Sequence, residues 1–262
     1  MSYLAGIVVG LQRAIVTYSR MPLKIDWQQA EPRVPSVAFL PWVGLLVGLF
    51  SAWPLLLVSV LMPNADASII ALLMLLTAVL LTGAFHEDGL MDTADGLFGG
   101  WDIKQRLSIM KDSHIGSYAA LAIWFTLTLK WLLLSQLIES GVNTAMLVGY
   151  WCLMHSLARL VPLIIMSCLK YCSAGKSKAA TMIAGLTLES FFWALIPSVL
   201  LSVYLLGVLT AAVLATSLLL FALLFGRYLY HKLGGFNGDT LGASEQMAEL
   251  IILFSYLSIS LS

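Results

Sequence analysis

The densest group of chemically reactive side chains in this sequence is an acidic segment that directly follows an apolar run. Within nine residues it carries four carboxylates, Glu87, Asp88, Asp92 and Asp95. At about 100° per helical residue the three aspartates fall within an arc of about 60°, so a helix here would bring their oxygens to one face. Converging carboxylates repel unless a hard divalent cation neutralises them, and Mg²⁺ prefers a few carboxylates together with phosphate oxygens. The alternative is a solvated helix start, but solvation alone does not explain the spacing.

Basic side chains follow the acidic segment before the next apolar run begins. They are Lys104, Arg106 and Lys111, and they are mixed with Asp112 and His114. Arginine offers phosphate a fork of donors, and lysine offers it a point charge. Cations beside a carboxylate cluster suit a metal-diphosphate site, although each one also fits an ordinary basic loop at a membrane.

Further polar residues stand near the C-terminus and inside an apolar run. Residues 234–243 read GGFNGDTLGA, and such glycines let backbone N–H groups approach an anion closely. Glu245 and Glu249 follow one helical turn apart, and a buried acid there is a site hypothesis by default. His155 and Arg159 must face protein or water rather than lipid. Structural pairing is the favoured role for His155, whereas Arg159 is expected either to pair with Glu249 or to reach a phosphate.

The elements that must position these residues are membrane helices. The chain has 262 residues, of which 60% are hydrophobic and 11% charged, and its mean hydropathy is +0.92. Soluble domains carry about 25% charged residues, so this composition excludes a water-soluble globular enzyme. Fourteen basic residues balance fourteen acidic ones, which leaves no basic field for binding nucleic acid.

Apolar runs of about 20 residues, enough to cross a bilayer core, divide the chain into hairpins. They cover residues 40–62, 67–85, 117–138 and 145–169, with a last run at 249–261 on a helix that begins near Gly242. Lys130 stands near the middle of its run, which raises the question of where that helix starts. The uncharged stretch from Phe191 to Phe225 is too long for one crossing, so we interpret it as two spans that break near Gly207. The N-terminal helix either spans or lies in the interface.

Basic residues orient these spans, because short cytoplasmic loops are enriched in lysine and arginine. Nearly all of them fall in the loops 19–36, 86–115, 170–190 and 226–242, and the three turns between these loops have none. Two spans separate successive basic loops, so all four are predicted to lie on one face. The sequence thus predicts an all-α polytopic integral membrane helical bundle with six or seven transmembrane helices. It forms a single domain over residues 1–262, with the active site at the cytoplasmic face.

Together these motifs resemble the cobalamin synthase family, whose activity is that of an adenosylcobinamide-GDP ribazoletransferase. The family pattern His-x-Asp-Gly-Leu-x-Asp-x-x-Asp-Gly is similar to residues 86–96, and Ile-Met-Lys-Asp-Ser-x-Ile-Gly is similar to residues 109–116. Residues 39–48 resemble the first span of the family, and residues 234–249 resemble its glycine-rich ending. The resemblance covers nearly the whole chain.

This resemblance implies a phosphotransferase that acts in a late step of cobalamin biosynthesis with Mg²⁺. It would transfer the cobinamide phosphate of adenosylcobinamide-GDP to a ribose hydroxyl of α-ribazole or α-ribazole 5′-phosphate. The products would be adenosylcobalamin, or its 5′-phosphate, and GMP. The expected location is the bacterial cytoplasmic (inner) membrane, with the lipid bilayer as a partner and no nucleic acid. Homo-oligomerisation stays open.

The resemblance also implies roles for individual residues. The expected ligands of one or two Mg²⁺ ions are Asp88, Asp92, Asp95 and, from the next helix, Asp112. Lys111 and Arg106 would stabilise charge on the GMP leaving group. The base is expected to be His86, Asp112 or a metal-bound hydroxide, and the sequence does not choose among them. The remaining expected substrate contacts are Lys104, Arg159, Asn237 and Asp239, of which the last two would complete the metal site or hold ribose.

Other functions fit part of this pattern. A CDP-alcohol phosphotransferase also has an Asp-Gly cluster at a membrane face, but its motif continues with Ala-Arg, whereas Asp88-Gly89 is followed here by Leu90-Met91-Asp92. Membrane prenyltransferases usually present two separated aspartate motifs, and this chain has one. A secondary transporter would also keep intramembrane charges, but it tends to place them at the midplane between internal repeats. No repeat is detected, so the transferase is preferred.

Overall fold

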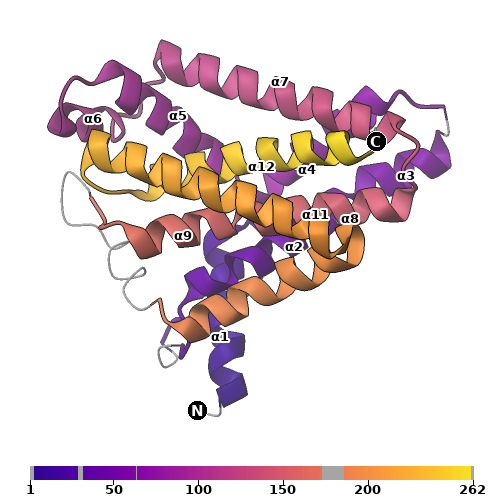
Figure 1. Ribbon diagram of the computed structural model, residues 1–262, viewed down its shortest axis with the longest axis horizontal. Coiled ribbons are helices and arrows are strands. Elements are labelled where there is room, and N and C mark those ends of the chain that lie inside the picture. The colour runs from indigo at the N-terminus through magenta and orange to yellow at the C-terminus, as the bar shows by residue number, and fades with distance from the viewer. Residues whose placement is uncertain (1–2, 29–31, 63, 173–185, 261–262) are drawn as a thin grey trace.

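The computed structural model describes residues 3–28, 32–62, 64–172 and 186–260 of the chain. Within these ranges all regular elements are helical, and one isolated bridge pairs Tyr171 with Phe236. The helices (Figure 1) are α1 (Tyr3–Tyr18), η1 (Ser36–Phe39), α2 (Leu40–Ser51), α3 (Trp53–Leu61), α4 (Ala67–Thr82), α5 (Phe85–Gly99), α6 (Ile103–Ile109), α7 (Ser117–Glu139), α8 (Thr144–Ala158), α9 (Leu160–Cys168), α11 (Leu188–Leu233) and α12 (Gly238–Ser260). The predicted all-α fold is confirmed.

Four helical segments are long and apolar enough to cross a membrane. They are Ser36–Val58, α7, Thr144–Cys168 and α11. A fifth candidate combines α4 with α5, which meet at a bend of 87°. The expectation of a helical membrane bundle is therefore met, and the number of six or seven spans stays a prediction.

The long uncharged stretch folds back on itself, as its length predicts. Gly207 interrupts α11 with φ 75° and ψ 164°, a backbone conformation that is essentially restricted to glycine. In Figure 1 the orange ribbon of α11 runs out from Leu188, turns at its far end and returns toward the start of α12. The predicted break near Gly207 is thus confirmed.

Two other predicted spans are interrupted by prolines. The run 40–62 breaks between α2 and α3, where Pro54 lacks an N–H to donate to the carbonyl of Phe50. The run 145–169 breaks between α8 and α9, where Pro162 has the same effect on the carbonyl of Ala158. The last helix begins at Gly238, four residues earlier than expected.

Helix α8 forms the centre of the bundle. All residues from Tyr150 to Ala158 are buried, and they pack among α2, α11 and α12.

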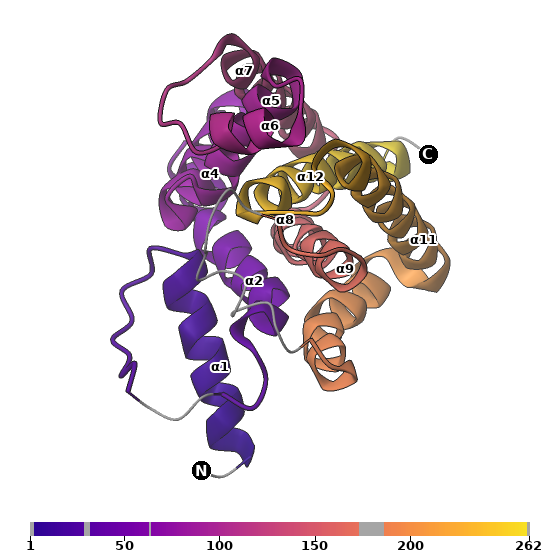
Figure 2. The same ribbon diagram turned by 90° about the vertical axis from the view of Figure 1, so that its left-hand side faces the viewer.

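Figures 1 and 2 both show α1 running across the direction of α7 rather than along it. Of the two placements open for the N-terminal helix, this orientation fits the interfacial one.

The basic loops meet at one end of the bundle, the end that faces the viewer in Figure 2. The N–H of Arg20 donates to the carbonyl of Leu81, and the N–H of Phe236 donates to that of Lys170. Arg106 Nη1 donates to the carbonyl of Lys232 at 2.9 Å. Residues 173–185 of the third loop lie outside the described residues. Three of the four basic loops thus contact one another in their described parts, and the first loop bonds to the end of α4.

Helices α5 and α12 approach one another closely at two glycines. A Cβ on Gly89 would lie 2.8 Å from the carbonyl oxygen of Asp239. A Cβ on Gly242 would lie 3.2 Å from the Cα of His86. Because glycine has no side chain, the two backbones can approach this closely, which brings the aspartates of α5 next to Asp239 of α12.

Gly89→Ala should therefore lower the free energy of unfolding by about 1–3 kcal/mol, since the added methyl must push α12 away. Thermal unfolding in detergent would measure this effect. Gly99→Ala is the matched control on the same helix, because its Cβ would meet Ile109 Cδ1 at an ordinary 3.6 Å. Equal unfolding temperatures for the two variants would contradict the close approach of α5 and α12.

Candidate active site

Three aspartates from α5 and α12 form what we call the acidic group: Asp88, Asp92 and Asp239. Asp88 is exposed, and the other two are half-buried. Among the described residues, the charges that act on Asp92 are all negative, and they belong to Asp239, Asp88 and Asp95. Asp239 lies within electrostatic range of Asp88 and of the cation Lys111. The structure thus brings two of the three same-face aspartates, Asp88 and Asp92, together with Asp239, which was expected to complete the metal site or to hold ribose.

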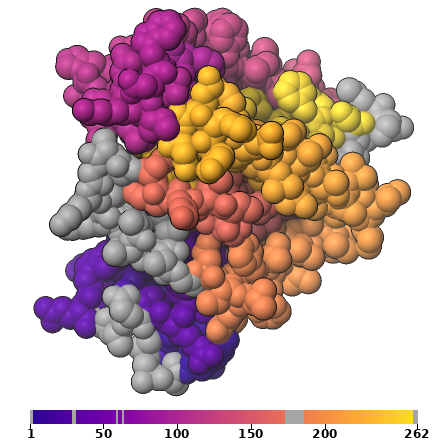
Figure 3. Space-filling view, turned by 60° about the vertical axis from the view of Figure 1, so that its left-hand side comes forward, coloured from indigo at the N-terminus to yellow at the C-terminus, as the bar shows by residue number. Residues whose placement is uncertain are grey.

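The donor set of the acidic group fits a hard divalent cation. Asp239 Oδ2 accepts a hydrogen bond from Asn237 Nδ2 at 3.1 Å, which restrains that carboxylate. Several carboxylates of like charge with one cation nearby leave negative charge uncompensated, and carboxylate oxygens are the ligands that Mg²⁺ prefers. Figure 3 shows this region from outside, where the magenta residues of α5 and α6 meet the gold residues of the α11–α12 turn.

Asp95 has a different environment from the acidic group. Its Oδ2 accepts the N–H of Gly116 at 2.6 Å, and its Oδ1 accepts the N–H of Ala119 at 2.9 Å. These N–H groups begin α7, whose own N-cap residue has no side chain to satisfy them. Asp95 therefore caps α7 from the neighbouring helix, and both of its oxygens are engaged. The sequence prediction of a free metal ligand did not anticipate this use.

Asn237 is a helix cap rather than an exposed substrate contact. Its Oδ1 accepts the N–H of Thr240 at 2.9 Å, and its own N–H donates to Thr240 Oγ1 at 3.0 Å. This reciprocal pair closes the start of α12. Its side-chain amide also donates to Met110 Sδ at 3.3 Å, and the residue is buried. The structure does not support the predicted ribose contact, and it makes Asn237 a positioning residue for Asp239.

Arg106 is engaged entirely by backbone carbonyls. Its Nε donates to Gly100 at 3.1 Å, its Nη2 to Trp101 at 3.0 Å, and its Nη1 to Lys232. These bonds fasten α6 to the end of α11. The predicted role on the leaving group is therefore not supported for Arg106. The other predicted cations, Lys104 and Lys111, are exposed.

Asp112 lies in the loop before α7 rather than on that helix. Its Oδ1 is 2.5 Å from His114 Nδ1 and also accepts the N–H of His114 at 3.1 Å. The side-chain hydrogen bond raises the pKa of His114 and lowers the pKa of Asp112. Both residues are exposed, and Asp112 is not among the charges that act on Asp92. The expectation that Asp112 joins the other aspartates is not supported.

A second set of charges is buried deeper along α12, and we call it the buried charge network. Its members are Lys130, His155, Arg159, Glu245 and Glu249, all at most 4% exposed. His155 Nδ1 lies 2.7 Å from Glu249 Oε1, and Arg159 Nη1 lies 2.9 Å from Glu245 Oε1. Lys130 donates to Glu249.

Three predictions are settled by this network. Structural pairing of His155 is confirmed. Arg159 pairs mainly with Glu245, whereas Glu249 lies 4.0 Å from it. Lys130 lies well inside α7, which starts where the apolar run predicts. Ligand atoms of His155, Glu245 and Glu249 lie within 4.8 Å of one another, and each of the two carboxylates already has a buried cation as a partner.

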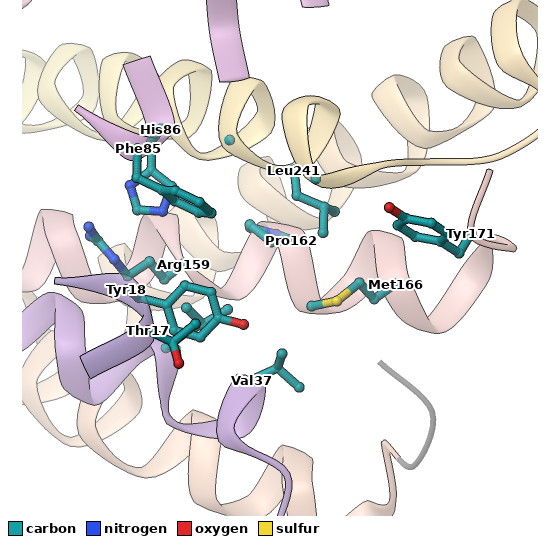
Figure 4. Close-up of a pocket in the computed structure, with 13 residues that line it drawn as sticks. Thr17, Tyr18, Val37, Phe85, His86, Arg159, Pro162, Met166, Tyr171 and Leu241 are labelled. Carbon is teal, nitrogen blue, oxygen red and sulfur yellow. The ribbon is translucent and has the colours of Figure 1, made fainter. Parts of the chain in front are cut away.

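His86 connects this network to a cavity at the end of the bundle. Its Nδ1 lies 3.5 Å from Glu245 Oε2, and its ring borders a cavity of about 160 Å³ with an open mouth. We call this space the apolar cavity, because its lining from α1, η1, α2, α5, α9 and α12 is mostly hydrocarbon (Figure 4). Arg159 also lines it. The predicted base His86 thus faces a cavity, whereas Asp112 does not.

Comparison with known proteins decides the family. Residues 10–257 match the cobalamin-5-phosphate synthase (CobS) family. The chain belongs to this family. An adenosylcobinamide-GDP ribazoletransferase of Shewanella pealeana is 40% identical over 84% of this chain and 83% of the relative. Proteins of the same name from Shewanella piezotolerans and Vibrio parahaemolyticus are 36% and 30% identical, over 94% of this chain and 93% and 90% of the relatives.

Membership of the cobalamin-5-phosphate synthase family makes the chain a transferase of cobalamin biosynthesis. No solved structure matches it. The sequence analysis missed the glycine contact between α5 and α12 and the apolar cavity, whose lining comes from several separate segments. Lys130 was a signal that could have revealed its partner, because a cation inside a membrane span requires an acid nearby.

Proposed function

We propose that this cobalamin-5-phosphate synthase family member transfers the cobinamide phosphate of adenosylcobinamide-GDP to a ribose hydroxyl of α-ribazole or α-ribazole 5′-phosphate. The bond from the cobinamide phosphorus to the oxygen that bridges the diphosphate breaks, GMP leaves, and a new bond forms from that phosphorus to the ribose oxygen. One observation carries the proposal: the close contact of α5 and α12 holds an acidic group beside an apolar cavity. The names of the relatives supply the substrates.

In this proposal Asp88, Asp92 and Asp239 would hold Mg²⁺. The bound ion would neutralise the diphosphate, which is the main requirement of phosphoryl transfer besides positioning. Asp95 would act indirectly, because it fixes the start of α7 against α5. Lys111 lies within range of Asp239, so it is the cation best placed to bind the phosphate of GMP.

The attacking ribose hydroxyl must lose its proton. His86 is our candidate base, because it lines the apolar cavity while its Nδ1 faces Glu245. The exposed pair of Asp112 and His114 is the alternative base. Lys104, exposed on α6, remains a second cation for the diphosphate. Arg159 borders the cavity but is paired with Glu245, so we assign it no phosphate.

We further place the protein in the bacterial cytoplasmic membrane with its site facing the cytoplasm. The basic loops gather at the end of the bundle that carries the acidic group, and such loops favour the cytoplasmic side. Protease digestion of inside-out and right-side-out vesicles would test this orientation, because only the former should expose the loop between α6 and α7.

Liposome-reconstituted protein should release GMP from adenosylcobinamide-GDP only when α-ribazole and Mg²⁺ are both present. Excess chelator should lower the rate at least about 100-fold, because the diphosphate charge is then uncompensated, and added Mg²⁺ should restore it. Chromatography of GMP measures the reaction. Release without an acceptor would indicate hydrolysis, and chelator-resistant release would contradict the metal. A CDP-alcohol substrate offered in parallel would reveal the rival phosphotransferase.

A further inference from the structure

We propose that the apolar cavity binds the aromatic base of the acceptor, so that the attached ribose projects toward the acidic group. α-Ribazole consists of a flat, bicyclic, uncharged aromatic base joined to a ribose. The inference rests on the proposed function and specifies which part of which substrate this cavity takes.

The position of the cavity carries the first step of this inference. Phe85 and His86 line it, and Asp88 lies in the same first turn of α5. Gly238 and Leu241 line it from α12, on either side of Asp239. The cavity and the acidic group therefore share the same two helix starts. A base held in the cavity would leave its ribose at the acidic group, where the phosphate must be attacked.

The chemistry of the lining carries the second step. Aromatic rings of Tyr18, Phe85 and Tyr171 border the space, and the first two meet edge to face with centroids 6.1 Å apart. Met166 and Leu241 add flexible hydrocarbon (Figure 4). Aromatic rings favour stacked or edge-on contacts with a flat heterocycle. The cavity holds about 160 Å³, less than a typical drug-sized ligand site, so it suits one small flat group such as the base of the acceptor rather than the much larger corrin.

The charge of the lining carries the third step. Among the described residues that border the cavity, Arg159 is the one lysine or arginine, and its Nη1 is paired with Glu245. Arg159 thus already has a carboxylate partner for its charge, whereas a neutral base needs no cation. Besides Arg159, the side-chain polar groups of the described lining are the His86 ring and the hydroxyls of Thr17, Tyr18 and Tyr171, which suit hydrogen bonds to a neutral base or its ribose. The cavity therefore favours an uncharged, mostly apolar aromatic group.

Met166→Trp should fill the cavity from α9 and raise the KM for α-ribazole at least about tenfold, the usual effect of disturbing an apolar subsite. The KM for adenosylcobinamide-GDP should stay within about twofold. Met166→Leu is the matched control, because it preserves volume and should change neither value by more than about twofold. An unchanged KM for α-ribazole in folded Met166→Trp, or an equal rise for both substrates, would overturn the inference.

Two measurements on the unaltered protein keep the inference testable if that variant does not fold. The free aromatic base of α-ribazole should compete with α-ribazole, and ribose alone should not. Competition by ribose alone would overturn the inference. Equilibrium dialysis with radiolabelled α-ribazole should show binding without donor, and the free base should displace it. If a lipid acyl chain fills the cavity instead, mass spectrometry would find a lipid that α-ribazole does not displace.

These readouts separate the two proposals. Absence of GMP release from the folded protein contradicts the proposed function, whatever binds in the cavity. GMP release combined with an unaffected Met166→Trp variant contradicts the cavity assignment alone. Dialysis reports on the cavity without any turnover, so a failure of one proposal is not mistaken for a failure of the other.

Discussion

Asp92→Asn should lower acceptor-dependent GMP release about 1000-fold or more, a loss of about 4 kcal/mol in transition-state stabilisation. The negative charges of Asp88, Asp95 and Asp239 all act on Asp92. Asp92 is therefore central among these aspartates. An amide keeps the shape of the side chain but loses the charge that would hold a cation. The variant should stay folded, because removing a repelled charge does not weaken the bundle.

The control for this variant is Asp102→Asn, the same chemical change ten residues further along. Asp102 caps α6 by accepting the N–H of Gln105 at 2.8 Å, and asparagine caps a helix about as well. GMP release by the Asp102→Asn variant should match that of the unaltered protein. Mg²⁺ should raise the unfolding temperature of the unaltered protein and of Asp102→Asn but not that of Asp92→Asn. Full activity in Asp92→Asn would show that Asp92 is not a metal ligand.

Glu249→Leu should lower the free energy of unfolding by about 3–5 kcal/mol, the cost of breaking a buried ion pair by removing one partner. Glu249 accepts from Lys130 and pairs with His155, and all three residues are buried. With the carboxylate gone, the Lys130 ammonium keeps Gln246 as a neutral partner but loses its nearest negative charge. Thermal or denaturant unfolding in detergent would measure the loss.

Two further variants identify the cause of that loss. The double variant Lys130→Met with Glu249→Leu should recover most of the stability, since replacing a whole buried pair by hydrocarbon is often neutral. Glu189→Leu removes one partner of an exposed pair, Arg33 with Glu189, and should cost less than about 1 kcal/mol. If the double variant is as unstable as Glu249→Leu, lost packing rather than the unpaired charge explains the effect.

Periodicity and length were enough to predict much of this architecture. The spacing of Asp88 and Asp92 predicts a shared helix face, and both contribute to the acidic group. The length of the stretch from Phe191 to Phe225 predicts the break at Gly207. These features depend on residues close together in the chain, where helical geometry determines which side chains share a face and how long a helix is.

Roles that depend on another helix were not predictable. Asp95 has the same residue type and spacing as its neighbours, yet its oxygens serve the start of α7. Arg106 stands among candidate phosphate ligands, yet each of its three side-chain nitrogens donates to a backbone carbonyl, one at the end of α11 and two in the loop before α6. A carboxylate suits a cation or a helix end equally well, and only the tertiary arrangement decides which one it meets.

The pairing of Lys130 with Glu249 also restricts the routes by which the sequence can evolve. A change at either position alone leaves the other charge inside the bundle without its nearest partner, whereas a change at both removes the pair together. Mutations that are tolerated together are thus harmful one at a time. Across descendants of one ancestor, positions 130 and 249 should be replaced as a pair, while Arg33 and Glu189 at the surface should drift independently.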